Sequence, residues 1–451
     1  MARAGWKEIA VLVICVSIPC YFSYISRAAA GKQILMVDFG ALYYGARCAV
    51  HGMDPYEPGP VLLEFEKDGG HFSSTASDEG MDRIVVTRID NLPTAMFLAI
   101  PFVLLPWVVA QNVWMVLMAA LLVIAAFHTW DLGGGAAPLI WVGLAGLTLA
   151  ESDLLFKGGN VAGVVVSLCI IAVWCILNER YAWLGVLLLA VSLVLKPHDS
   201  GFVWLYFLLA GGALRKRALQ TLAATGVLAG CAALWMVSVS PHWFSELHRN
   251  LSFLLAHGGA SDPGPAGMSS YAAGMIIDLQ GVLSFIKDNP HFYNSLAWIL
   301  GGLPILVLCV AALRRPTSPQ GTRLALAAIS ALSLLPVYHR INDAVILLLA
   351  LPACAMLWKE RAPERWPALV LTSAGILFTA STPLALLVSN YRAIAAIASE
   401  LPGRLPGAVL LRPTPVVLLA MGYFYLWVYL RHVLAEAKEP YHTVPVAAAA
   451  G

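Results

Sequence analysis

Residues 38–56, DFGALYYGARCAVHGMDPY, lie between two strongly apolar stretches of the chain. After Asp38, apolar residues recur at the i, i+3, i+4 and i+7 spacing that marks one face of a helix. Gly52 ends this pattern, and Pro55 disfavours helix in the residue before it, so a turn is expected there. The segment predicts an amphipathic helix that lies along a membrane face and begins at a carboxylate.

Asp38 has two compatible interpretations. Aspartate is a favoured helix N-cap, because its oxygens accept the unpaired N–H groups of the first turn. A carboxylate fixed at the start of a helix is also held in a defined position, as a catalytic group must be. The sequence leaves both roles open.

The composition of the whole chain is that of a membrane protein. Of its 451 residues, 59% are hydrophobic and 12% are charged, whereas a soluble domain is about 25% charged. Apolar stretches recur from end to end, and several are shorter than the roughly 20 residues that a bilayer requires. We expect an all-α polytopic fold in a single integral-membrane domain over residues 1–451, with about 11–13 transmembrane helices.

The basic residues orient this expected fold. Short loops that contain Arg215–Arg217 and Arg314-Arg315 should be cytoplasmic, which places two long loops, residues 27–91 and 240–295, outside. One outside loop ends near residue 91, and the next outside segment begins near residue 151. Three apolar stretches lie between them, although a chain that leaves and returns to the same side must cross an even number of times. The stretch 136–150 is therefore expected to be re-entrant.

Other sequence features narrow the class of protein. The N-terminal apolar stretch is long for a signal peptide, so a retained anchor is expected. The eight cysteines have neither the spacing of a disulfide framework nor that of a structural zinc site. Basic runs are too short to follow a phosphate backbone, and no nucleic-acid partner is expected.

Three groups of polar residues stand where apolar stretches end at the predicted outer face. Ionisable groups at membrane depth are costly and are therefore functional candidates. Arginine as a bidentate donor, with lysine or histidine beside it, would suit a phosphate, although each residue alone could also be an interfacial or capping residue. The groups are Glu151, Asp153, Lys157 and Asn160; Lys196, His198 and Asp199; and His339, Arg340 and Asp343.

The segment 38–56 resembles family 87 of the GT-C-type integral-membrane glycosyltransferases, in which an Asp precedes a Tyr-rich helix, a Gly and a D-P-Y turn. Shorter matches follow in order: Gly158–Val161 is similar to a G-Q-x-N motif, Lys196–His198 to K-P-Q, and Tyr338–Arg340 to a late aromatic-His stretch. Residues 91–93, Asn-Leu-Pro, depart from the usual Y-P-P. The resemblance implies a GT-C fold with juxtamembrane helices in the first outside loop.

The resemblance also implies an activity. An inverting transferase of this kind moves a sugar, mannose for the family's mycobacterial member, from a polyprenyl-phosphate donor to a hydroxyl group. The acceptor would be a lipid-linked or cell-envelope glycan at the outer face of the plasma membrane, facing the periplasm or the cell exterior. The sequence leaves the sugar, the acceptor, the linkage and the oligomeric state open.

Site residues follow from the same resemblance and from their chemistry. Asp38 would be the general base, and a single base with in-line displacement gives inversion. The leaving phosphate needs charge stabilisation and little general acid, and the first loop has no D-x-D motif, so no cofactor and no obligatory metal are expected. The phosphate would contact His339, Arg340, Lys196 and His198, and the substrates would contact Tyr43, Tyr44, Asn160 and Asp343.

Two other classes of protein fit parts of the pattern. A transporter or flippase of a lipid-linked sugar also places isolated charges in a helix bundle, often with an internal repeat. No repeat is visible in the hydropathy pattern, and the ionisable groups gather at one face rather than at the midplane. A polytopic scaffold of a cell-envelope complex is the third possibility, and it would tolerate loss of Asp38.

Overall fold

The computed structural model describes residues 6–30, 36–70, 72, 77–264, 274–314 and 318–436. Within these ranges the chain forms helices and a single isolated antiparallel bridge, between Ile276 and Arg340. Seven helices are long and apolar enough to cross a membrane, or up to nine if each of two bent helix pairs counts as one span. The all-α polytopic fold is confirmed. The expected 11–13 spans are more than this count, because several apolar stretches form helices too short to span alone.

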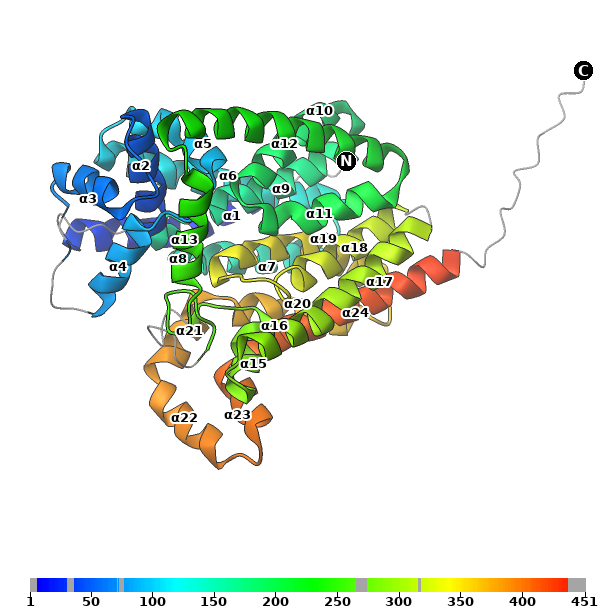
Figure 1. Cartoon of the computed structure of the whole chain (residues 1–451). Coiled ribbons are helices and arrows are strands. Elements are labelled where there is room, and N and C mark those ends of the chain that lie inside the picture. Colours follow the sequence, from blue (N-terminus) through cyan, green and yellow to red (C-terminus); the bar gives the residue numbers. More distant parts are fainter. Residues whose placement is uncertain are drawn as a thin grey trace, which may run out of the picture.

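The spanning helices form one bundle (Figure 1). They are α1 (Trp6–Ala30), α6 (Trp107–Leu132), α7 (Pro138–Ala150) with α8 (Asp153–Gly158), α12 (Gly212–Val239), α16 (Pro290–Ala297) with η2 (Trp298–Gly302) and α17 (Leu303–Arg314), η3 (Ile341–Ala350) with α19 (Leu351–Lys359), and α24 (Pro413–Glu436). The bent pairs are α9 (Ala162–Leu177) followed by η1 (Glu179–Tyr181) and α10 (Ala182–Leu195), and α20 (Arg365–Phe378) followed by α21 (Ser381–Ser389).

Shorter helices complete the fold. They are α2 (Val37–Val50), α3 (Pro58–Lys67), α4 (Ser77–Thr87), α5 (Pro93–Val103), α11 (Pro197–Ala210), α13 (Trp243–Leu254), α15 (Leu279–Ile286), α18 (Pro319–Leu332), α22 (Tyr391–Glu400) and α23 (Arg404–Leu411). In Figure 1, α2, α3 and α4 lie together at one end of the bundle, and α22 and α23 project from one side. The helices α9, α18 and η3 are buried on almost every side and form the core, as expected of helices that are apolar all round.

Helix α2 lies where the sequence predicted a helix, but most of its residues, including 39–46, are buried, so it is not the amphipathic surface helix that was expected. It ends at Val50, and Gly52 then adopts a positive φ of 72°, which a glycine accepts without steric cost. The residue at the N-cap position is Met36, and Asp38 is the second residue of the helix. The N-cap interpretation of Asp38 is therefore wrong, and its carboxylate is directed to other partners.

The first apolar stretch after the outer loop forms an 11-residue helix, which is too short to span a membrane alone. Helix α5 packs along α2, and both of its flanks are bonded to that region: Tyr56 Oη donates to Asn91 O at 3.0 Å, and Tyr43 Oη donates to Leu105 O at 2.8 Å. Proline residues at 101 and 106 shorten the helix.

This placement corrects the prediction for residues 136–150. The stretch is not re-entrant, because Pro138–Gly158 has the length and hydropathy of a span. Since α5 is too short to span alone, α6 and α7 give the even number of crossings that the charge pattern requires. The odd count arose from treating the stretch that contains α5 as a span.

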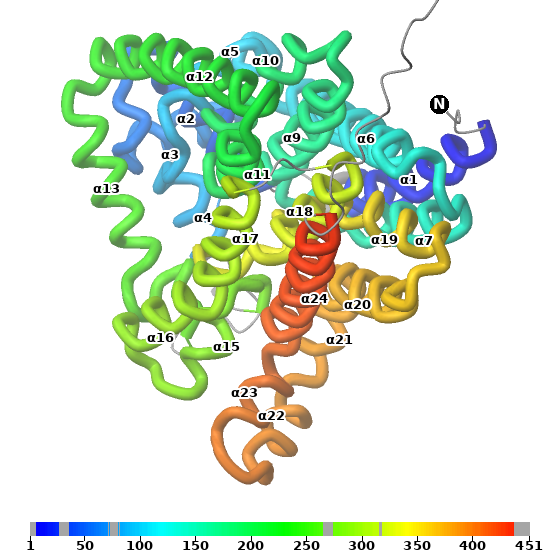
Figure 2. The backbone as a smooth tube through the Cα atoms, turned by 90° about the vertical axis from the view of Figure 1, so that its right-hand side faces the viewer, coloured from blue at the N-terminus to red at the C-terminus, as the bar shows by residue number. Residues whose placement is uncertain are grey.

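Helix α13 fastens the second long loop to the first one. Figure 2 shows α13 running from the end of α12 towards α16. Ser240 Oγ donates to Asp54 Oδ2 at 2.8 Å, and the buried amide of Asn250 donates to the carbonyl oxygens of Tyr56 and Ile89 at 3.0 Å each. The D-P-Y turn is thus the point where the two loops meet.

The bonds of Asn250 predict a stability effect. Asn250→Ala leaves two carbonyl oxygens without their donor, so we expect the free energy of unfolding to fall by about 1–3 kcal/mol. Thermal unfolding in detergent measures this. Ser245→Ala, at an exposed position of the same helix, is the matched control and should unfold as the wild type does. Equal melting temperatures for all three proteins would contradict the role given to Asn250.

Candidate functional site

A cavity of about 380 Å³ lies where α2, the α4–α5 connection, the α8–α9 turn, the α10–α11 turn, α13 and residues 337–343 meet. Its wall contains both acidic and basic side chains, and α13 with the residue that follows it contributes three leucines. Six of the nine predicted site residues line it: Asp38, Asn160, Lys196, His198, Arg340 and Asp343. Segments as far apart in the sequence as Asp38 and Asp343 therefore converge on one space.

Asp38 is held by the turn between α8 and α9. Asn160 Nδ2 donates to Asp38 Oδ2 at 2.8 Å, and Asn160 Oδ1 accepts the N–H of Ala162 at 2.9 Å. Gly158 lies against the same oxygen, because a Cβ atom there would be 2.8 Å from Oδ2. The carboxylate thus has a fixed position with no space for a side chain behind it.

The surroundings of Asp38 raise the pKa of its carboxyl group above that of free aspartate. Burial raises its pKa, and the charge of Asp343 adds to this effect. The guanidinium of Arg340, the amide of Asn160 and the ammonium of Lys196 act in the opposite direction, and burial prevails. A base needs this combination of a defined position and an increased proton affinity.

Lys196 brings a permanent positive charge to the wall. Its Nζ contacts Asp343 Oδ1 and lies 3.3 Å from Asp199 Oδ2. Burial would lower the pKa of Lys196, but the two carboxylates outweigh it and the pKa is raised. Asp343 also accepts the backbone N–H of Arg340 at 2.9 Å, so it joins the two basic residues.

Arg340 is positioned by its backbone as well as by its side chain. The N–H of Ile277 donates to His339 O at 3.0 Å, and the N–H of Ile341 donates to Met275 O at 2.8 Å, which pairs this segment with residues 275–277. The guanidinium donates to Ala260 O at 3.3 Å and to the hydroxyl of Tyr338. It is therefore held at the cavity wall as a charged donor.

His339 lies behind the wall and not in it. Its side chain is fully buried, with Nδ1 at 3.0 Å from Val337 O and Nε2 at 3.5 Å from Asp199 Oδ1. A carbonyl oxygen only accepts, so Nδ1 carries a proton, and a second proton on Nε2 suits the carboxylate. Burial would lower the pKa of His339, but the carboxylates of Asp199 and Asp343 raise it. Direct contact of His339 with a phosphate in the cavity, as the sequence predicted, does not fit this position.

His198 does line the cavity, 5.1 Å from His339 between ring centroids. Burial and the charge of Lys196 lower the pKa of His198 to about 4. At neutral pH it is an uncharged imidazole that can donate one hydrogen bond. Its expected contribution to a phosphate site is thus directional and not ionic.

Tyr43 and Tyr44 lie outside the cavity wall. Both rings are buried and pack on Trp107, with centroid distances of 5.0 and 5.1 Å. Tyr43 Oη donates to Leu105 O, and Tyr44 Oη donates to Asp68 Oδ2 at 3.3 Å. These tyrosines fix α2 against α3, α5 and α6, and the structure does not bring them to the substrate position expected from the sequence.

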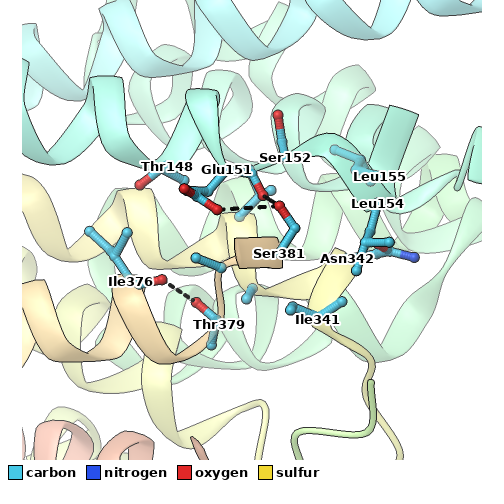
Figure 3. A pocket seen from close by; sticks show the side chains of 13 residues that line it. Thr148, Glu151, Ser152, Leu154, Leu155, Ile341, Asn342, Ile376, Thr379 and Ser381 are labelled. Atoms are coloured by element: carbon cyan, nitrogen blue, oxygen red, sulfur yellow. Dashed lines mark hydrogen bonds between the residues drawn. The ribbon is translucent and has the colours of Figure 1, made fainter. Parts of the chain in front are cut away.

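The group around Glu151 is also separate from the cavity. Glu151 accepts the N–H of Thr382 at 2.9 Å and contacts Ser381 at 3.3 Å, beside a small cavity of about 30 Å³ (Figure 3). Lys157 pairs with Asp153 at 2.7 Å. Glu151, Asp153 and Lys157 thus bond to partners outside the cavity. Of the predicted group of four, only Asn160 lies in the cavity wall.

Five polar wall residues were not predicted as site residues: Arg88, Asp90, Asn91, Ser261 and Tyr338. Arg88 lies over the ring of Phe253 at 3.9 Å, and burial and the charge of Asp38 raise the pKa of Asp90. The sequence does carry a signal for three of them, since R-I-D-N immediately precedes an apolar stretch. The criterion that selected the three other groups, polar residues at the end of an apolar stretch, would also have selected Arg88, Asp90 and Asn91.

One cluster has the ligand types of a metal site. Ligand atoms of His198, Asp199, His339 and Asp343 all lie within 4.8 Å of one another. However, the ammonium of Lys196 already contacts both carboxylates. Lys196 balances one of the two negative charges, and a proton on His339, whose pKa the same carboxylates raise, would balance the other without a metal ion.

This charge balance predicts that the cluster binds no stoichiometric metal. The protein, dialysed against Zn²⁺ or Mn²⁺ and then against buffer, is expected to carry no bound metal by mass spectrometry. Lys196→Met removes the ammonium and leaves the carboxylates uncompensated, so this variant should retain more metal than the wild type. One metal ion per wild-type chain that is lost in Asp199→Asn would overturn the assignment.

One of the comparisons with known proteins gave a match. The sequence profile of glycosyltransferase family 87 matches residues 92–338, a range that includes Asn160, Lys196, His198 and Tyr338. Comparisons with curated proteins and with solved structures gave no match. Asp38 precedes the matched range, and Arg340 lies two residues beyond its end. The match covers more than half of the chain, and the protein is therefore a member of glycosyltransferase family 87.

Proposed function

We propose that this membrane glycosyltransferase moves a sugar from a polyprenyl-phosphate donor to a hydroxyl group of a lipid-linked or cell-envelope glycan. One observation carries the proposal: a carboxylate held by Asn160 shares a cavity with the cations of Lys196 and Arg340. The resemblance of residues 38–56 favours mannose as the sugar.

The proposed reaction uses one base and no general acid. Asp38 takes the proton of the acceptor hydroxyl while that oxygen bonds to the anomeric carbon of the donor sugar. The bond between this carbon and the phosphate oxygen breaks, and its electron pair stays on the phosphate. The configuration at the anomeric carbon is inverted, and Asp38 carries the proton at the end.

The leaving polyprenyl phosphate carries one more negative charge than the donor did. Lys196 and Arg340 are charged before the reaction and fixed by Asp343, so they can stabilise this charge without reorganising. His198 would add a neutral hydrogen bond. His339 would act through Asp199, as a positioning residue for Lys196.

The apolar part of the wall suits lipid substrates. Leu251 and Leu254 of α13 and Leu255 directly after it line the cavity, while Phe244 on the same helix is exposed. A helix with this distribution can lie at the membrane interface and admit a lipid chain beside it. Opening of the cavity by α13 would then control access.

The basic residues support a site on the outer face of the plasma membrane. Helix α11 begins beside the cavity at His198, and α12 starts with Arg215–Arg217 after α11 has run to the other end. Positive loops favour the cytoplasm, so the cavity would face the periplasm or the cell exterior. A flippase would be expected to hold its ionisable groups nearer the midplane.

The central test is a membrane assay with radiolabelled polyprenyl-phosphate mannose. Asp38→Asn and Asp38→Ala are expected to lower transfer by about 10²–10⁴-fold, the usual contribution of a general base, while donor binding persists. Asp153→Asn makes the same chemical change at an ion pair outside the cavity wall and should stay active.

Asp90→Asn decides which carboxylate of the cavity is the base. Because Asn160 orients Asp38, Asp90→Asn should retain more turnover than Asp38→Asn. The reverse order would transfer the role to Asp90. Transfer at the wild-type rate in both Asp38 variants would contradict the mechanism. Transport of the lipid-linked sugar would then be the activity to measure next.

Gly158 provides an independent test of geometry. Gly158→Ala places a methyl group against Asp38 Oδ2, so we expect transfer to fall at least about tenfold, because small displacements of a catalytic group are costly. Gly143→Ala, on the exposed side of α7 with no atom near the new methyl group, is the control. Unchanged transfer in Gly158→Ala with an unchanged melting temperature would contradict a catalytic position for Asp38.

A further inference from the structure

A second cavity, of about 490 Å³, lies at the other end of the bundle. Helix α9 starts beside Val161 in the wall of the first cavity and ends at Leu177 in the wall of the second. Helix α18 contributes its first turn to the second cavity and leads to residues 337–340 of the first. The two cavities therefore open on opposite faces of the bundle.

Arg323, near the start of α18, gives the second cavity a cation. Its guanidinium is half-buried and contacts the sulfur of Met356 at 3.7 Å. Among the described side chains, no carboxylate lies within 4.0 Å of it. Glu360 is the acidic residue whose charge acts on Arg323, but its carboxylate accepts a hydrogen bond from Gln320, at 2.9 Å, and none from Arg323. A guanidinium in this setting favours an anionic ligand.

The same cavity also contains carboxylates and an apolar wall. Asp131 near the end of α6 and Glu179 of η1 line it, and Trp174 and Leu349 are among its apolar residues. Two acids against one arginine give the wall a net negative charge. A ligand that is only an anion would meet repulsion, whereas a ligand with both a phosphate and an ammonium would find a partner for each.

We propose that this cavity binds the headgroup of an aminophospholipid. The phosphodiester is held by Arg323, the ammonium by Asp131 and Glu179, and the acyl chains lie along the apolar wall. Such a lipid would contact one end of each of the helices α6, α9 and α18. The opposite ends of these helices form or adjoin the first cavity. The site is separate from the proposed transfer chemistry and is independent of it.

Lipid binding to the delipidated full-length protein, followed by native mass spectrometry, tests the proposal. We expect phosphatidylethanolamine to bind more tightly than phosphatidylglycerol, and inorganic phosphate to bind weakly. Arg323→Gln should weaken phosphatidylethanolamine binding by about tenfold or more, since a charge-assisted hydrogen bond is lost. Arg323→Lys keeps the charge and should retain part of the affinity. Arg314→Gln, at an exposed arginine outside the cavity wall, is the matched control.

The acids provide a second readout. Asp131→Asn combined with Glu179→Gln should abolish the preference for phosphatidylethanolamine over phosphatidylglycerol while lipid still binds. Melting temperatures without added lipid verify that each variant is folded. The proposal is overturned if folded Arg323→Gln binds phosphatidylethanolamine like the wild type, if the wild type prefers phosphatidylglycerol, or if inorganic phosphate binds as tightly as lipid.

Discussion

The hydrogen bond from Asn160 to Asp38 is the contact on which the site depends. It joins the first turn of a loop helix to the turn that starts a core helix, 122 residues later in the chain. Because Asn160 is itself fixed by the N–H of Ala162, the position of the carboxylate is set by the most buried part of the bundle. Close approach of Gly158 leaves this carboxylate no second position behind it.

Charge pairing organises the opposite side of the cavity. Lys196 contacts the carboxylates of Asp199 and Asp343, and Asp343 also binds the backbone of Arg340. In a region of low dielectric constant, each of these charges would be costly alone and is stabilised by its neighbours. The result is a set of cations that stays charged over the physiological pH range and faces Asp38 across the cavity.

The sequence by itself determined the class of protein and much of the site. The low content of charged residues and the recurring apolar stretches indicated a membrane protein. Helices are expected there, because they pair their own backbone groups inside the bilayer. The i, i+3, i+4 pattern and Gly52 defined α2, and polar residues at the ends of apolar stretches led to Lys196, His198, Arg340 and Asp343. These inferences succeed because hydropathy and helix termination depend on residues close in the chain.

Only the tertiary structure decided which side chains face the cavity. The stretch that contains α5 has the hydropathy of a span but rests on α2, because hydropathy reports an apolar environment and not which neighbours supply it. Tyr43 has an apolar ring and a polar tip, which suit a buried packing position as well as a substrate site, and packing on Trp107 decides between them. His339 and Arg340 are adjacent in sequence, yet one is buried behind the wall and the other lies in it. Their placement comes from backbone pairing with residues 275–277, a long-range contact that no local pattern encodes.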